Sequence, residues 1–217
     1  MTDTTALRTM MVDTQVRPSD VTKFPIIEAL LAIEREAFVP ADKSPVAYMD
    51  EPIVLAPGRV LSDARGFAKM LDALDLERDE LVLDLGCGLG YSAAILARMV
   101  DAVVAVEEDS DMARDAEATL GEKGIDNVAV LHAPLVEGAP KAGPYDVIVI
   151  EGGVETIPSA IEDQLKEGGR IAAVFVEGAL GTCRIGHKSK GRISYKIVFN
   201  ATLPVLPGFA LEKGFSF

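Results

Sequence analysis

The sequence has no tryptophan, and only two cysteines and two histidines among its 217 residues. Cys87 and Cys183 lie far apart along the chain, a spacing that suits neither a disulfide framework nor a zinc-binding motif. His132 and His187 have no matching acidic pattern around them, so we expect no metal site. The scarcity of cysteine is typical of a reducing compartment, and we expect the protein to be cytoplasmic.

Long apolar runs and positive charge are also scarce. No run approaches the roughly 18 residues of a membrane span, and the first residues lack the apolar core of a signal peptide. The chain has 21 basic against 34 acidic residues, which gives a formal net charge of −13. This charge repels phosphates, so we expect neither nucleic acid nor membrane as a partner. From Gly178 onward six residues are basic and only Glu212 is acidic. We interpret this segment as a solvated hairpin face rather than a patch for an acidic partner.

From residue 81 to residue 176, short apolar runs alternate with segments whose apolar residues have helical spacing. Hydrophobic residues make up 49% and charged residues 25%, a globular balance, and the length favours one domain. The predicted strands are residues 81–85, 102–106, 128–131, 147–150 and 171–176, and the predicted helices are 91–99, 110–123 and 157–165. This alternation predicts an α/β fold, with a parallel sheet covered by helices on both faces.

The regions on either side of this alternation have other patterns. Residues 7–16 and 22–33 have helical spacing, and a third helix is expected after Ser62, which we interpret as its N-cap. Residues 45–58 predict a long irregular segment with one short strand, a candidate substrate surface. Residues 183–186 and 193–199 predict an antiparallel hairpin. We expect one domain over residues 1–217, with a helical extension and substrate loop at 1–76 and a cofactor-binding sheet core at 77–217.

A glycine-rich turn, residues 84–90 (Asp-Leu-Gly-Cys-Gly-Leu-Gly), follows the first predicted strand of this core. Glycines let the backbone approach a ligand closely, and the next helix begins with free N–H groups. A nucleotide-like ligand is therefore expected at this end of the sheet. The dinucleotide fingerprint needs glycine where Tyr91 stands, which disfavours a nicotinamide-dependent oxidoreductase. Cys87 has no histidine to activate it, so we interpret it as a packing or cofactor contact.

Two acidic residues accompany the turn. Glu107 ends the second predicted strand, where a carboxylate can accept hydrogen bonds from both ribose hydroxyls, and Asp84 precedes the first glycine of the turn. The acids and the G-x-G-x-G run resemble motif I of the S-adenosylmethionine-dependent methyltransferases. The resemblance implies S-adenosyl-L-methionine as the cofactor. The cofactor-binding residues that it implies are Asp84, Gly86, Cys87, Gly88, Gly90, Tyr91, Glu107, Ala133 and Leu135.

Several segments together resemble one family of these enzymes, the protein-L-isoaspartate O-methyltransferases. They are residues 11–17 (MVDTQVR), 35–40 (REAFVP), 47–50 (AYMD), 58–62 (GRVLS), 144–146 (PYD) and 164–170 (QLKEGGR). The resemblance implies a Rossmann-like methyltransferase fold, doubly wound around a mostly parallel seven-stranded sheet. It also implies transfer of a methyl group to the α-carboxylate of an isoaspartyl residue in a damaged protein or peptide. That carboxylate is ionised at neutral pH and needs no general base. Ser62 is implied as the catalytic residue that orients it.

The substrate half departs from the family pattern. Arg59 and Val60, expected to contact substrate, stand where the family has glutamine and threonine, so Arg59 either receives an acidic substrate or plugs the cleft. Glu151 and Gly152, also expected to contact substrate, stand where the family has threonine and alanine. Glu151 would repel an anionic substrate unless it pairs with Arg59 or Arg65.

The cofactor half departs in one segment, residues 133–135, which stands where the family has glycine-aspartate-glycine. Pro134 replaces the aspartate that contacts adenine in the family, which leaves apolar contacts from Ala133 and Leu135. We expect isoaspartyl methylation by a monomer or small homo-oligomer. Two alternatives stay open: a methyltransferase with another acceptor, and a non-catalytic descendant that acts as a binding or regulatory module.

Overall fold

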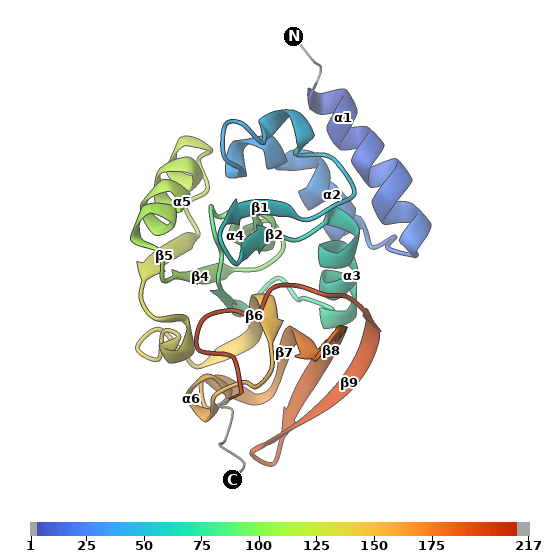
Figure 1. Ribbon diagram of the computed structural model, residues 1–217. Coiled ribbons are helices and arrows are strands. Elements are labelled where there is room, and N and C mark those ends of the chain that lie inside the picture. Colours follow the sequence, from blue (N-terminus) through green and yellow to red (C-terminus); the bar gives the residue numbers. More distant parts are fainter. Residues whose placement is uncertain (1–3, 212–217) are drawn as a thin grey trace.

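A seven-stranded sheet organises the computed structural model, which describes residues 4–211 (Figure 1). Glu212 of the basic C-terminal segment lies outside these residues. The strand order is β5-β4-β3-β6-β7-β8-β9, with parallel pairing from β5 to β7 and antiparallel pairing of β8 and β9. The strands are β3 (Leu81–Leu85), β4 (Ala102–Glu107), β5 (Val128–His132), β6 (Tyr145–Val154), β7 (Leu165–Glu177), β8 (Leu180–Ser189) and β9 (Arg192–Asn200). The expected mostly parallel α/β sheet with a C-terminal antiparallel hairpin is confirmed.

Alternating strand residues build a core on each face of the sheet. Successive side chains of a strand point to opposite faces, so Val147 and Val149 join one core while Ile148 and Ile150 join the other. The helices are α1 (Thr4–Met11), α2 (Phe24–Ala32), α3 (Ala64–Leu74), α4 (Tyr91–Ala97), α5 (Ser110–Glu122) and α6 (Ser159–Glu162). Helices α1 to α4 cover the first core, and α6 with residues 203–209 helps to cover the second. Within residues 4–211 no helix has the length and apolar character to cross a membrane.

The N-terminal segment is helical where its periodicity predicts helices. Helix α1 continues into a π-helical turn at Val12–Val16 and a 3-10 turn at Arg17–Ser19. Helix α2 ends at Ala32, and a 3-10 turn at Arg35–Phe38 follows it. These elements pack on α3 and α4 and bury their apolar face in the first core.

A two-stranded hairpin precedes α3. The strand expected within residues 45–58 is β1 (Ile53–Ala56), and its partner β2 (Arg59–Leu61) was not predicted. Gly58 makes the turn possible, because its φ of +74° lies in the left-handed region. The prediction of Ser62 as a helix cap is wrong: Asp63 caps α3, and its carboxylate accepts a hydrogen bond from the Gly66 N–H at 2.7 Å. Asp63 is one residue closer to the helix, which puts its carboxylate over the first turn.

The helix predicted at residues 157–165 is also wrong over most of its length. Only Ser159–Glu162 is α-helical, and β7 begins at Leu165. The side chain of Gln164 ends the helical turn by donating to the Ala160 carbonyl at 2.7 Å, and it accepts from the Ala139 N–H at 2.9 Å. The apolar spacing of Ile161 and Leu165 reflects their burial in the second core rather than a long helix.

A fully buried arginine joins the N-terminal segment to the end of the hairpin. Arg35 donates from Nε to the Ala47 carbonyl at 2.8 Å and from Nη2 to the Ser62 carbonyl at 2.6 Å. Its guanidinium carbon lies 4.8 Å from the centre of the Tyr91 ring. One side chain therefore fixes residue 62 relative to the first turn of α4.

We predict that Arg35→Met lowers the free energy of unfolding by about 3 kcal/mol, because two buried carbonyl groups lose their donors. Urea denaturation followed by circular dichroism measures the change. Arg114→Met, which removes an exposed arginine of α5, is the control and should leave the stability essentially unchanged. Equal stabilities of the two variants would contradict the structural role of Arg35.

Candidate functional site

The carboxyl ends of β3, β4 and β6 meet at the glycine-rich turn. Gly86, Gly88 and Gly90 have φ values of +81°, +56° and +96°, which other residues adopt only with strain. The Gly86 N–H donates to the Val106 carbonyl at 2.8 Å and ties the turn to β4. Helix α4 begins directly after the turn, at Tyr91. The sequence folds here as expected for a ligand-binding edge.

Two buried carboxyl groups at this edge have an oxygen without a hydrogen-bond partner among the described residues. Asp84, in β3, accepts from the Ser92 hydroxyl at Oδ2 over 2.7 Å, whereas its Oδ1 has no partner. Glu151, in β6, has an unpartnered Oε1. Burial raises the pKa of Asp84 to about 7 and, with repulsion from Asp84 as a further cause, the pKa of Glu151 well above its ordinary range. Acceptor oxygens of this kind suit a ligand with a cationic or hydrogen-bond-donating group.

The third acid of the edge, Glu107, is fully buried and fully paired. Arg59 donates from Nη1 to Oε1 and from Nη2 to Oε2, each over 2.6 Å. The Asp109 N–H donates to Oε1 at 3.1 Å and the Gly88 N–H to Oε2 at 2.8 Å. Burial opposes the charge on Arg59, but the bound carboxylate outweighs it and holds the pKa of the guanidinium above its ordinary value.

Three side chains cover the glycine turn. A Cβ atom built at Gly88 would lie 2.7 Å from Leu55 Cδ1. One built at Gly86 would lie 3.4 Å from both Arg59 Nη2 and Leu206 Cδ1. The hairpin β1/β2 and the C-terminal segment therefore fill the space that the missing side chains of the turn leave.

The C-terminal segment, residues 201–211, is one part of the site that sequence reasoning missed. It crosses the end of β6 (Figure 1), where the Gly153 N–H donates to the Pro204 carbonyl at 2.7 Å. A Cβ atom at Gly152 would lie 2.4 Å from Leu206 Cγ. The only signal for this approach was the Gly152-Gly153 pair, since consecutive glycines at a strand end permit close backbone packing.

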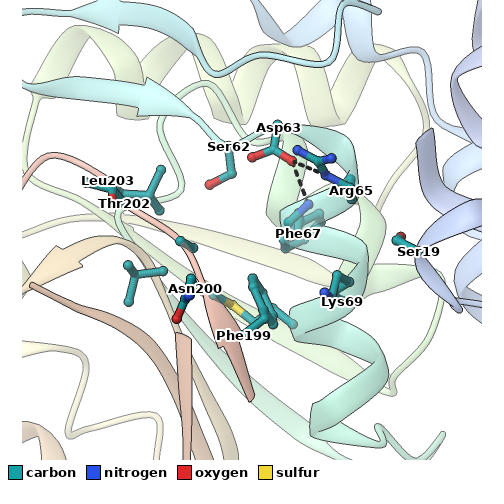
Figure 2. A pocket seen from close by; sticks show the side chains of 14 residues that line it. Ser19, Ser62, Asp63, Arg65, Phe67, Lys69, Phe199, Asn200, Thr202 and Leu203 are labelled. Carbon is teal, nitrogen blue, oxygen red and sulfur yellow. Dashed lines mark hydrogen bonds and ion pairs between the residues drawn. The ribbon is translucent and has the colours of Figure 1, made fainter. Parts of the chain in front are cut away.

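A groove of about 420 Å³ lies between α3 and the end of β9. Figure 2 shows Ser62 and Asp63 on one side and Phe199 and Asn200 on the other, with the Ser62 hydroxyl directed into the space between them. Lys69, on α3, also lines the groove. The groove thus combines hydroxyl, amide and cationic groups beside the hairpin that carries Arg59.

The remaining predicted site residues lie in varied surroundings. Neither arginine expected near Glu151 pairs with it, because Arg59 binds Glu107 and Arg65 lies 3.6 Å from Asp50. Val60 is half-buried in β2, and Ala133 is half-buried after β5. Leu135 is fully buried in the second core.

The thiol of Cys87 is buried, and burial raises its pKa well above the ordinary value. A thiol held neutral in this way is a poor nucleophile. Within residues 4–211 no three His, Cys, Asp or Glu side chains are grouped in a way that could hold a metal ion.

Comparison with known sequences gives a consistent result along the chain. The sequence model of the family "Protein-L-isoaspartate(D-aspartate) O-methyltransferase" matches residues 8–202. A protein-L-isoaspartate O-methyltransferase of Opitutus terrae is 37% identical over 164 residues, which are 76% of this chain and 70% of that protein. One from Koribacter versatilis is 32% identical over 186 residues, 86% of this chain and 84% of that protein.

Solved structures show the same fold. A protein-L-isoaspartate O-methyltransferase structure matches with a TM-score of 0.80 and 24% identity, covering 94% of this chain and 65% of that one. A structure described as a putative protein-L-isoaspartate O-methyltransferase from Plasmodium falciparum, in complex with S-adenosyl-L-homocysteine, matches with a TM-score of 0.79 and 18% identity, covering 95% and 99%. Because the family match spans the N-terminal helices, the hairpin and the sheet alike, this chain belongs to the protein-L-isoaspartate(D-aspartate) O-methyltransferase family.

Proposed function

We propose that this chain transfers a methyl group from S-adenosyl-L-methionine to the α-carboxylate of L-isoaspartyl residues in damaged proteins or peptides. The observation that carries the proposal is the buried, unpartnered Oδ1 of Asp84 beside the glycine turn, in a chain whose family match covers residues 8–202. An unpartnered buried carboxylate oxygen is costly, and the ammonium group of a methionine moiety would satisfy it.

The cofactor half of the proposed site lies within the sheet core at residues 77–217. Asp84 would face the methionine end of the cofactor, and the turn at Gly86 and Gly88 would lie against it. Glu107 would accept hydrogen bonds from the ribose hydroxyls. When bound, S-adenosyl-L-methionine supplies an activated methyl group on a sulfonium centre. The unpartnered acceptor Oδ1 of Asp84 fits the charged end of the cofactor as it stands, whereas Glu107 is held by Arg59.

The acceptor half consists of residues 1–76 and the end of β9. Ser62 lies at the edge of the groove, its carbonyl fixed by Arg35, so its hydroxyl has a defined position from which to donate to a substrate carboxylate. Lys69 supplies positive charge on the same groove for an acidic peptide. In this proposal Ser62 and Lys69 bind and align the acceptor. Alignment is the main requirement, because the nucleophilic carboxylate is already ionised.

Glu151 does not repel the substrate carboxylate in this proposal, although it is an acidic residue. Burial raises its pKa well above the ordinary range, so the fold favours the neutral acid at this position. A neutral carboxyl group does not repel the α-carboxylate and can donate one hydrogen bond to it. Glu151 is therefore retained as a proposed substrate contact, whereas the side chain of Leu206 packs against Gly152.

We predict that Ser62→Ala lowers the rate of methyl transfer to an isoaspartyl peptide by about tenfold or more, because one hydrogen bond to the aligned carboxylate is lost. Transfer of labelled methyl groups to an L-isoaspartyl peptide measures the rate, with the matching L-aspartyl peptide as the substrate control. Ser110→Ala, at the exposed start of α5, is the matched serine control and should retain the full rate.

An unchanged rate in Ser62→Ala would remove Ser62 from the mechanism. Methylation of proteins in a cell extract, without methylation of the isoaspartyl peptide, would favour a different acceptor. Absence of both activities together with absence of S-adenosyl-L-homocysteine binding would favour the non-catalytic alternative.

We predict that the unfolding free energy decreases by about 2 kcal/mol as the pH rises from 5 to 8 and that Asp84→Asn flattens this decrease. Burial raises the pKa of Asp84 from 3.8 to about 7 in the folded chain, so the folded state holds the proton over a range where the unfolded state has lost it. The stability due to the bound proton is present at low pH and is lost as the pH rises through about 7. Urea denaturation at several pH values measures the slope, and identical slopes for both proteins would refute the prediction.

A further inference from the structure

The Arg59–Glu107 ion pair occupies the carboxylate on which the proposed function places the cofactor's ribose. We propose that Arg59 is an internal competitor for the ribose subsite, so that the cofactor binds only by displacing its guanidinium from Glu107. This inference rests on the proposed function, because it assigns the subsite to S-adenosyl-L-methionine. In this proposal Arg59 controls access of the ribose to that subsite.

The geometry leaves the ribose no free acceptor. A carboxylate offers about four lone-pair positions, and Glu107 uses them for two guanidinium N–H groups and for the N–H groups of Gly88 and Asp109. A third contact holds the guanidinium in place, since Nη2 also donates to the Gly86 carbonyl at 3.1 Å. Ribose hydroxyls can donate to Glu107 only after Arg59 has left.

The subsite remains formed when the guanidinium leaves. The hydrogen bonds from Gly88 and Asp109 come from the backbone of the glycine turn and the start of α5. They hold the Glu107 carboxylate in position independently of Arg59. When Arg59 is displaced, two ribose hydroxyls therefore replace two guanidinium N–H groups as donors to Glu107, and the carboxylate stays in place.

The hairpin offers Arg59 another position. Arg59 directly follows the turn residue Gly58, at the tip of the two-stranded hairpin β1/β2. A cavity of about 350 Å³ lies beside it, lined by Gly58, Arg59, Glu108 and Asp109 among others. The two acids supply negative charge for a displaced guanidinium. The same hairpin carries Leu55 over Gly88, so withdrawing the tip would uncover the glycine turn as well.

Competition by a bound side chain weakens ligand binding, because only the fraction of molecules with Glu107 released is competent. The Arg59 side chain is 9% exposed and the Glu107 side chain is 0% exposed. Opening such a buried pair without a replacement partner is strongly unfavourable. A glutamine at position 59 would lose this competition, since it carries no charge and cannot make the bidentate contact.

Isothermal titration calorimetry with S-adenosyl-L-homocysteine tests the proposal on the full chain. We expect Arg59→Gln to bind the ligand at least about tenfold more tightly than the unsubstituted protein. Arg59→Lys keeps the charge but loses the bidentate geometry and should bind with intermediate affinity. The matched control is Arg170→Gln, which breaks another Arg–Glu pair, with N–O distances of 2.7 and 2.8 Å to Glu80, outside the proposed subsite. It should bind as the unsubstituted protein does.

The thermal unfolding midpoint provides a second readout on the same proteins. Without ligand, Arg59→Gln should unfold at a lower temperature because Glu107 is buried without its partner. Saturating S-adenosyl-L-homocysteine should raise the midpoint of this variant more than that of the unsubstituted protein. If Arg59→Gln does not fold, Arg59→Lys carries the test.

If the Arg59 variants bind S-adenosyl-L-homocysteine as tightly as the unsubstituted protein, or more weakly, the competition is overturned. The proposed function would remain intact. No binding by any of the proteins at millimolar ligand would overturn both the competition and the proposed function. Tighter binding by Arg170→Gln to the same extent would show a general effect of lost stability and would also overturn the assignment to Arg59.

Discussion

Three carboxyl groups are buried at one edge of the sheet, and only one of them, Glu107, is paired with a guanidinium among the described residues. Asp84, Glu107 and Glu151 end or approach the ends of adjacent parallel strands, so the topology itself brings the acids together. Charged groups of one sign tolerate burial only when they are paired, neutralised or bound to a ligand. In this chain Arg59 pairs Glu107, and burial favours the protonated forms of Asp84 and Glu151.

Two of these charged residues, Arg59 and Glu151, stand at positions where the chain departs from the family pattern. In the proposed function the acids and the glycine turn are the cofactor edge, and the groove beside Ser62 is the acceptor side. Position 59 lies at the tip of a hairpin whose Leu55 and Arg59 approach the glycine turn, and Ser62 of the groove directly follows the end of this hairpin. Arg59 therefore contacts the acid of the proposed cofactor subsite, although position 59 lies in the segment expected to contact substrate.

The sequence predicted the sheet well because its strands are apolar runs and its turn has a distinctive glycine spacing. Asp84 and Glu107 were identified for the same reason, since strand ends can be located from the pattern. The partner of Glu107 was not identified, because 48 residues separate it from Arg59 and no periodic signal links them. The contacts of Leu206 were equally hidden, since an irregular segment has no pattern that reveals what it covers. The short α6 was mispredicted because core burial gave Ile161 and Leu165 a helical spacing.

The position of Arg59 in the presence of ligand tests the account most directly. A crystal structure of the chain with saturating S-adenosyl-L-homocysteine should show the ribose hydroxyls on Glu107 and the Arg59 guanidinium withdrawn from that carboxylate. A structure with the ligand seated at the glycine turn while Arg59 still holds both oxygens of Glu107 would contradict it.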